Sequence, residues 1–109
     1  MATDFYERLI SKYEPLTEAE FLTLVSVQEP ILGAALPAKI AALTRGQLQL
    51  GMGTLFTNLH AMTQDYLIKE SVDAHDQHSY VITGSGQAVL AAEANRLRLL
   101  SQICAEARV

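Results

Sequence analysis

Apolar residues recur at helical spacing along most of this chain, and the pattern predicts a largely α-helical protein. Phe5, Leu9 and Tyr13 fall on one face of a first helix. The sequence Thr-Glu-Ala-Glu at residues 17–20 is a capping box, in which a hydroxyl and a carboxylate each accept a hydrogen bond from a free backbone N–H. A second helix is therefore predicted from there to about residue 28.

Two further helices are predicted in the middle of the chain. The third covers about residues 35–44 and the fourth about residues 52–64, because apolar positions keep helical spacing in both. Phe56 is also expected to be a core residue. The other side chains expected to be buried in these helices are Leu36, Ile40, Leu43, Leu55, Leu59 and Met62.

A β-hairpin is predicted after the fourth helix. Residues 66–68 and 79–82 are rich in β-branched and aromatic side chains, and a polar stretch separates them. The order of helix, strand, turn and strand is that of a winged helix-turn-helix, in which one helix enters a DNA groove. The predicted fold class is therefore mostly α (α+β), a winged helix-turn-helix with a two-stranded wing. Its core spans residues 16–83, after an N-terminal helix in 1–14.

A long last helix, in the segment 84–108, carries a wide apolar surface. The small core leaves nothing in the chain for this surface to pack on, and a symmetric dimer is the commonest way to cover it. The segment is therefore predicted to be a dimerisation helix, on which Glu93 and Arg96 form an ordinary i, i+3 pair. The residues expected at the dimer interface are Phe5, Leu9, Val89, Leu97, Leu100 and Cys104.

The composition fits one domain, residues 1–109, near the size at which a partner subunit adds stability. The formal net charge of −4 argues against binding of nucleic acid by bulk electrostatics, since phosphate neutralisation needs clustered Lys and Arg. No apolar run approaches the ~18 residues of a membrane span, and no secretory signal is recognisable, so a cytoplasmic protein is expected. No nucleophile–base pair or phosphate-binding glycine loop indicates an enzyme, and no cofactor is expected.

Short motifs mark the central part of the chain in a fixed order. They are Leu-Thr-x-Ala-Glu-Phe at 16–21, Leu32-Gly33, Gly-Thr-Leu-Phe at 53–56, Leu67-Ile68 and Tyr80-x-x-Thr83-x-x-Gly86. In this order and spacing they resemble the PadR family of bacterial transcriptional regulators, which has Gly-Thr-Leu-Tyr at the third motif. The resemblance implies a dimeric winged-helix repressor with the 52–64 helix in the major groove and the hairpin on the DNA backbone or minor groove. It also implies a small aromatic or multidrug-type effector near the dimer interface.

The parts expected to face DNA depart from the family pattern because they carry almost no positive charge. Between residues 46 and 95 the one cation is Lys69, and the wing carries Asp73 and Asp76. Like charge weakens binding to phosphate, whereas neutral side chains still read bases. The residues expected to contact double-stranded DNA are Lys39, Arg45, Met52, Thr54, Thr57, Asn58, Lys69 and His78. The alternative is a winged-helix module with weak or lost DNA binding that instead binds a protein with a basic or apolar surface.

Histidines near this face raise two further questions. His75 and His78 lie in a flexible turn that does not fix a tetrahedral geometry, so no metal site is predicted. Protonation of these two imidazoles and of His60 adds positive charge to the parts expected to face DNA. DNA binding is therefore predicted to strengthen as the pH falls from about 7.5 to about 6.

Overall fold

The structure is a computed structural model that describes residues 2–109 and the side chains of residues 5–109; Met1, in the predicted N-terminal segment, lies outside the described residues. The helices are α1 (Ala2–Tyr13), α2 (Glu18–Ser26), α3 (Leu36–Leu43), α4 (Met52–Gln64) and α5 (Gly84–Ala107). The strands are β1 (Ile31–Leu32), β2 (Ile68–Val72) and β3 (His78–Ile82), and the 3-10 turn η1 (Gly33–Ala35) leads into α3. None of the helices in the described range has the length and apolar character that crossing a bilayer demands.

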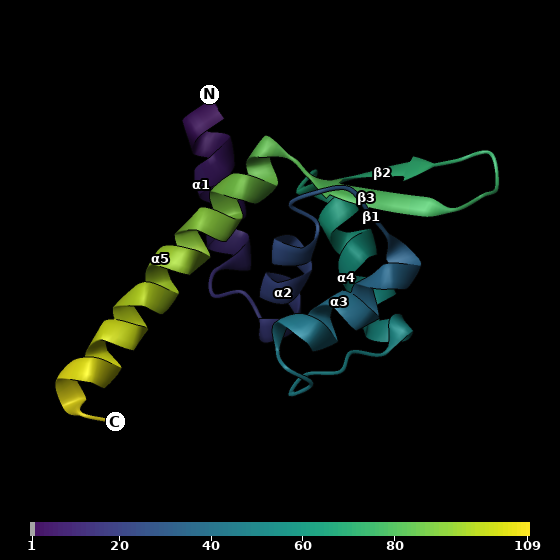
Figure 1. The fold of residues 1–109 in the computed structure, drawn as a ribbon. Coiled ribbons are helices and arrows are strands. Elements are labelled where there is room, and N and C mark those ends of the chain that lie inside the picture. The colour runs from purple at the N-terminus through teal and green to yellow at the C-terminus, as the bar shows by residue number, and fades with distance from the viewer. Residues whose placement is uncertain (1) are drawn as a thin grey trace.

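The mostly helical winged fold predicted from the sequence is confirmed. Helices α2, α3 and α4 pack together, the hairpin of β2 and β3 projects from one side of them, and α1 runs along α5 on the other side (Figure 1). The predicted capping box opens α2, since the Thr17 hydroxyl accepts from the Glu20 N–H at 3.0 Å and the Glu20 carboxylate accepts from the Thr17 N–H at 2.8 Å. The C-terminal half of α5 extends beyond the other helices (Figure 1).

The sheet has one more strand than the predicted hairpin. Its order is β1-β3-β2, and β1 pairs with β3 through Ile31 opposite Tyr80 and Leu32 opposite Ser79. Two residues are too few to show a strand periodicity, which is why the sequence pattern does not reveal β1. Gly33 follows directly, where a Cβ would lie 3.1 Å from Cε2 of Tyr80. The Leu-Gly motif therefore lets the chain pass close to the tyrosine ring.

The first wing strand lies further along the chain than predicted. The pattern places Tyr66 in this strand, but Tyr66 has a φ of 61°, in the left-handed region, and belongs to the turn that follows α4. Strand β2 begins at Ile68 and continues through polar residues to Val72. Its backbone hydrogen bonds to β3 define it, with Ile68 opposite Ile82 and Val72 opposite His78.

Two predictions of buried side chains are wrong. Helix α4 buries Leu55 and Leu59, whereas Phe56 is 53% exposed because it lies about 100° further round the helix. Leu43 is 48% exposed, whereas Thr44, the C-cap four residues after the buried Ile40, is half-buried. Both side chains therefore lie outside the core.

The Tyr80-x-x-Thr83-x-x-Gly86 motif holds the start of α5 against the turn between α4 and β2. The Thr83 hydroxyl accepts from the Gly86 N–H at 3.1 Å and donates to the Tyr66 carbonyl at 2.6 Å. A Cβ at Gly86 would lie 2.1 Å from the carbonyl oxygen of Leu67. Only glycine fits a contact this close, so the motif fixes the long helix directly on the backbone of the turn.

We predict that Gly86→Ala destabilises the protein by about 3 kcal/mol, because the backbone of Leu67 must move to admit the methyl group. Gly53→Ala is the control, since nothing lies within 4 Å of a Cβ added there. It is expected to raise stability by at most about 1 kcal/mol. Urea unfolding followed by circular dichroism measures both variants, and equal midpoints would contradict the prediction.

A buried carboxylate also holds α5. Glu93 is 2% exposed, and its Oε1 accepts from the Leu16 N–H at 3.2 Å and from Nε of Arg96 at 2.9 Å, while Nη2 of Arg96 bonds Oε2. The hydrogen bond from Arg96, supported by that from Leu16, holds the pKa of Glu93 below its ordinary value against the opposing effect of burial. The predicted i, i+3 pair is therefore present, and through the Leu16 N–H its buried carboxylate also joins α5 to the segment that opens α2.

We predict that Glu93→Gln lowers the free energy of unfolding at neutral pH by about 2 kcal/mol. The pKa of Glu93 is lower in the folded protein than in the unfolded chain, where it is near 4.5. The stabilisation is therefore present above about pH 4.5 and is lost as the pH falls through the folded-state pKa.

Urea titrations at a series of pH values should show the difference between wild type and Glu93→Gln shrinking from about pH 5 to about pH 3. Glu106→Gln, at an exposed position on the same helix, is the control and should differ little from wild type throughout. A stability difference for Glu93→Gln that stays constant over this range would contradict the role of the ionised carboxylate.

Candidate nucleic-acid interface

Helix α4 presents an outer face to solvent. Thr54 and Thr57 are exposed on it, and the Thr57 hydroxyl donates to the Gly53 carbonyl at 3.0 Å. Met52, at the first position of α4, is half-buried and packs against the core. Asn58 is half-buried, and its Nδ2 is enclosed with no hydrogen-bond partner among the described residues. Asn58 is therefore less accessible than the two threonines, and contact of all three with DNA stays a prediction.

Gly53 leaves one exposed position in the first turn of α4 without a side chain. Nothing lies within 4 Å of a Cβ placed on Gly53, and its φ is not positive. A glycine in a helix costs up to about 1 kcal/mol relative to alanine. No close contact within the described chain requires this glycine, and its absence of a side chain lets an outside surface approach the helix backbone.

The three cations predicted to meet phosphate lie on separate elements. The Lys39 ammonium donates to the carbonyl of Ser26 at 2.9 Å, so this half-buried cation is already engaged at the C-terminal end of α2. Arg45 is exposed in the turn after α3, with a φ of 54°. Lys69 is exposed on β2. Of the three, Arg45 and Lys69 are the ones with exposed side chains.

The two faces of the wing carry opposite charges. Side chains alternate along a strand, so neighbours on β2 point to opposite faces. Glu70 pairs across the hairpin with Tyr80 and bonds it on the face turned toward α4, whereas Lys69 pairs with Val81 on the other face. The acidic face therefore looks toward the helix and the cation looks away from it.

The aspartates of the wing have different environments. Oδ1 of Asp73 accepts from the backbone N–H groups of His75 at 2.8 Å and Gln77 at 3.0 Å, which closes the turn. Asp76 has a φ of 59°, and its side chain is 92% exposed. Asp73 therefore serves to form the turn, whereas Asp76 adds a negative charge at the tip of the wing.

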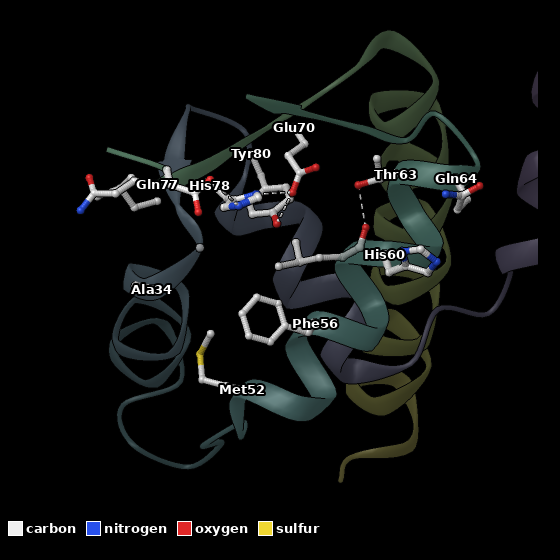
Figure 2. Close-up of a pocket in the computed structure, with 14 residues that line it drawn as sticks. Ala34, Met52, Phe56, His60, Thr63, Gln64, Glu70, Gln77, His78 and Tyr80 are labelled. Carbon is white, nitrogen blue, oxygen red and sulfur yellow. Dashed lines mark hydrogen bonds and ion pairs between the residues drawn. The ribbon is translucent and has the colours of Figure 1, made fainter. Parts of the chain in front are cut away.

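A cleft of about 790 Å³ separates α4 from the wing. Figure 2 shows Met52 and Phe56 along its helix side, with Tyr80, His78 and Glu70 on the opposite side. The exposed ring of Phe56 therefore faces this cleft. Helical periodicity explains the arrangement, because positions 52, 56, 60 and 63 form a stripe on α4 beside the buried one.

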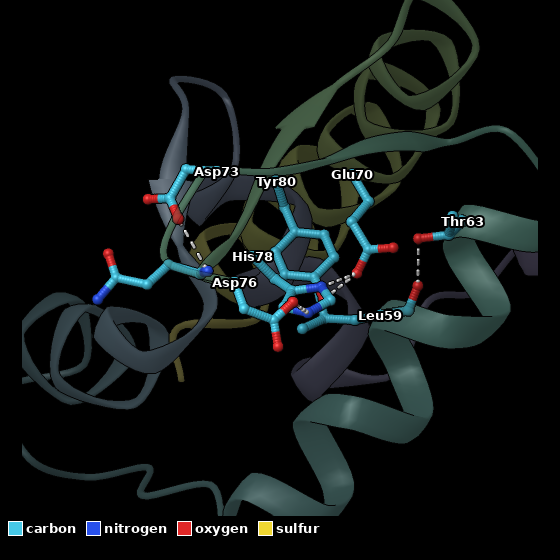
Figure 3. Close-up of polar contacts among 8 residues, drawn as sticks. Leu59, Thr63, Glu70, Asp73, Asp76, His78 and Tyr80 are labelled. Atoms are coloured by element: carbon cyan, nitrogen blue, oxygen red, sulfur yellow. Dashed lines mark hydrogen bonds and ion pairs between the residues drawn. The ribbon is translucent and has the colours of Figure 1, made fainter.

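A hydrogen-bonded cluster forms the polar wall of the cleft (Figure 3). Oε2 of Glu70 accepts from the Tyr80 hydroxyl at 2.7 Å and lies 2.9 Å from Nδ1 of His78. The bond from Tyr80, followed by that to His78, holds the pKa of Glu70 below its ordinary value. Burial, aided by the bond to Glu70, raises the pKa of Tyr80 to about 12. Glu70 is therefore ionised at neutral pH and Tyr80 is neutral.

Two carboxylates flank the imidazole of His78. Its Nδ1 lies 2.9 Å from Oε2 of Glu70, and its Nε2 lies 4.0 Å from a carboxylate oxygen of Asp76. Both carboxylates therefore compete with a DNA phosphate for this side chain. Contact of His78 with DNA stays a prediction.

The predicted dimer surface divides into two groups. Leu9 and Val89 are buried in the core of the single chain, and their place in the interface stays a prediction. Phe5 and Cys104 are exposed, and Leu97 is half-buried. An exposed apolar strip remains near the end of α5. It consists of Leu99, Leu100 and Ile103.

Among the described residues, no three His, Cys, Asp or Glu side chains are grouped to hold a metal ion.

A family model described as the transcriptional regulator PadR-like family matches residues 21–92. No curated protein matches the chain by sequence.

Solved structures share the fold. A transcriptional regulator from Clostridium thermocellum has a TM-score of 0.73 at 15% identity, over 91% of this chain and 93% of that one. A PadR family transcription regulator from Clostridium difficile has a TM-score of 0.65 at 21% identity, over 83% and 98%. BpsR from Bordetella bronchiseptica, whose DNA binding is regulated by 6-hydroxynicotinic acid, has a TM-score of 0.63 at 17% identity, over 93% and 78%.

Proposed function

Because the chain belongs to the PadR-like family of transcriptional regulators, a family of regulators and not of enzymes, we propose that it is a homodimeric, ligand-responsive repressor. It binds double-stranded DNA through the outer face of α4 and through the wing. The observation that carries the proposal is that face of α4, which is exposed, neutral and open at Gly53. A major groove admits an α-helix, and the missing side chain at position 53 lets the helix backbone approach the DNA closely there.

The chemistry of this face suits direct contact with bases. The hydroxyls of Thr54 and Thr57 bond to base edges, and their methyl groups pack on thymine methyls. Phosphate contacts supply less of the affinity, because Arg45 and Lys69 are the exposed ones among the three predicted cations and Lys69 lies on the wing face turned away from α4. Two such contacts per protomer give a slope of log affinity against log salt of about −4 for a dimer.

A polar contact connects the N-terminal helix to the end of α4. Asp65, the C-cap of α4, accepts from the Lys12 ammonium at 2.8 Å and from the Tyr13 hydroxyl at 2.6 Å. These two bonds hold the pKa of Asp65 below its ordinary value. Since α1 packs along α5, a change in the dimer geometry reaches the DNA-facing helix through this contact. The regulated neighbour BpsR supports the idea that such a fold responds to a small ligand.

We predict that Gly53→Ala lowers the affinity for an operator-like duplex by about tenfold, which corresponds to about 1.4 kcal/mol, because the methyl group stands between the helix and the DNA. The duplex is first selected from a random library at about 50 mM salt, and fluorescence anisotropy then measures affinity. Gly84→Ala is the matched control, since the nearest atom to its Cβ, the Tyr6 hydroxyl oxygen, lies at an ordinary 3.5 Å and α4 is not involved. Equal affinities of the two variants would contradict the role of Gly53.

The same selection separates the repressor from its alternative. The acidic face of the wing, with Glu70 and Asp76, favours a basic or apolar protein partner over phosphate. If the folded dimer selects no duplex even at about 50 mM salt, the repressor proposal fails and the protein-interaction module is favoured.

We predict that the double substitution of Leu100 and Ile103 by glutamate gives a monomer whose fold is intact, because both side chains are exposed in the single chain. Leu43→Glu changes a leucine that is exposed to a similar degree on α3 and should leave the dimer unchanged. Sedimentation velocity measures the mass of each variant. A wild-type protein that sediments as a monomer at micromolar concentration would refute the dimer.

A further inference from the structure

The cleft between α4 and the wing contains an exposed apolar surface that the DNA contacts proposed for Thr54, Thr57, Arg45 and Lys69 do not use. Phe56 and Leu32 are 53% and 40% exposed there, and Met52 completes the apolar side. Burial of a side chain such as Phe contributes about 1.5–3 kcal/mol, so two large apolar groups left in water around one cleft favour an occupant. A volume of about 790 Å³ lies in the range of sites for small organic molecules.

The polar wall opposite has a carboxylate oxygen available for that occupant. Both hydrogen bonds of Glu70, from Tyr80 and with His78, involve Oε2, and no bond within the described chain engages Oε1. The two bonds hold the carboxylate in place, and its side chain is 36% exposed. A charge that is fixed and partly screened from water binds an opposite charge more strongly than a mobile surface carboxylate does.

The charges around the cleft select the sign of the ligand. Glu70 and Asp76 contribute carboxylates, and the other titratable side chains that line it are the imidazoles of His60 and His78 and the phenol of Tyr80. No Lys or Arg lines the cleft over the described part of the chain. An anion such as a phosphate or a carboxylic acid therefore meets like charge, whereas an ammonium group reaches a ready acceptor.

We propose that this cleft binds an organic amine that carries an aromatic or apolar body, and that its occupancy lowers the affinity for DNA. The body packs on Phe56 and Met52, and the ammonium group donates to Oε1 of Glu70. An amine near the ring of Phe56 also gains a cation–π interaction. The occupant spans α4 and the wing, so it sets their separation and thereby changes the affinity for DNA. This change in DNA affinity rests on the proposed function, whereas binding of the amine in the cleft does not.

The binding is tested with one ring system in three charge states. The probes are 1-naphthylmethylamine, 1-naphthalenemethanol and 1-naphthaleneacetic acid, titrated into the ¹⁵N-labelled full chain and followed by ¹H–¹⁵N correlation spectra. The amine should bind at least about tenfold more tightly than the alcohol, and the acid more weakly still. Shifts should concentrate at residues 52–63 and 70–80. Equal binding of the amine and the acid, or shifts confined to other residues, would overturn the proposal.

Two variants separate the polar and apolar contributions. Glu70→Gln keeps the size of the side chain and should abolish the preference for the amine over the alcohol while leaving the affinity for the alcohol unchanged. Phe56→Ala should weaken the amine and the alcohol alike by about tenfold. Phe5→Ala, at an exposed phenylalanine on α1, is the matched control and should change neither. Phe56 and Glu70 are exposed, and the ¹H–¹⁵N correlation spectrum of each variant without ligand shows whether its fold is intact.

The effect on DNA is measured separately. The amine should lower the affinity of the wild-type protein for the selected duplex, and it should have little effect on Glu70→Gln at the same concentration. Binding of the amine in the cleft without any change in DNA affinity would overturn the regulatory half of the proposal. A protein that selects no duplex would refute the proposed repressor, while the spectra still decide whether the amine site exists.

Discussion

The close contact between Gly86 and the carbonyl of Leu67 is the constraint on which the arrangement of the molecule depends. Three structural units meet there: the end of α4, the start of the wing and the first turn of α5. The Thr83 hydroxyl bonds on both sides of the contact, so the long helix starts at a fixed place relative to α4. The buried carboxylate of Glu93 adds a second attachment two turns further along. A change in the direction of α5 therefore cannot be absorbed at its base and is passed to the helix and the wing.

The sequence predicted best where a single local rule decides the structure. The capping box at Thr17, the bounds of α4 and the junction of strand and helix at Thr83 each depend on neighbouring residues, and the structure confirms the elements they mark. Phe56 was misjudged because apolar character alone does not tell the buried face of α4 from the adjoining one. The partner of Glu93, the Leu16 N–H, lies 77 residues away in the sequence, and helical spacing reveals only Arg96.

The weak positive charge of the DNA-facing side has a partial structural explanation. Asp73 forms the turn of the wing, and Glu70 holds Tyr80, whose ring lies against Gly33 at the start of η1. These acids stabilise the hairpin and its attachment to β1, whatever the hairpin binds. The sequence pattern shows the charges but not these partners, so it treats every acidic side chain of the wing as a surface group. Asp76 alone is fully open to solvent and acts only through its charge.

Three sets of positions on helix α4 face in three different directions. Positions 55, 59 and 62 are buried, positions 53, 54 and 57 face outward, and positions 52, 56 and 60 face the cleft. Because these stripes share one rigid helix, an occupant of the cleft does not need to touch the outward stripe to affect it. It needs only to change the distance between α4 and the wing, the two elements that we propose to contact the duplex. The core beside Phe56 is already filled by Leu55 and Leu59, so the ring of Phe56 is left exposed in the cleft. In that position it is available to the proposed ligand.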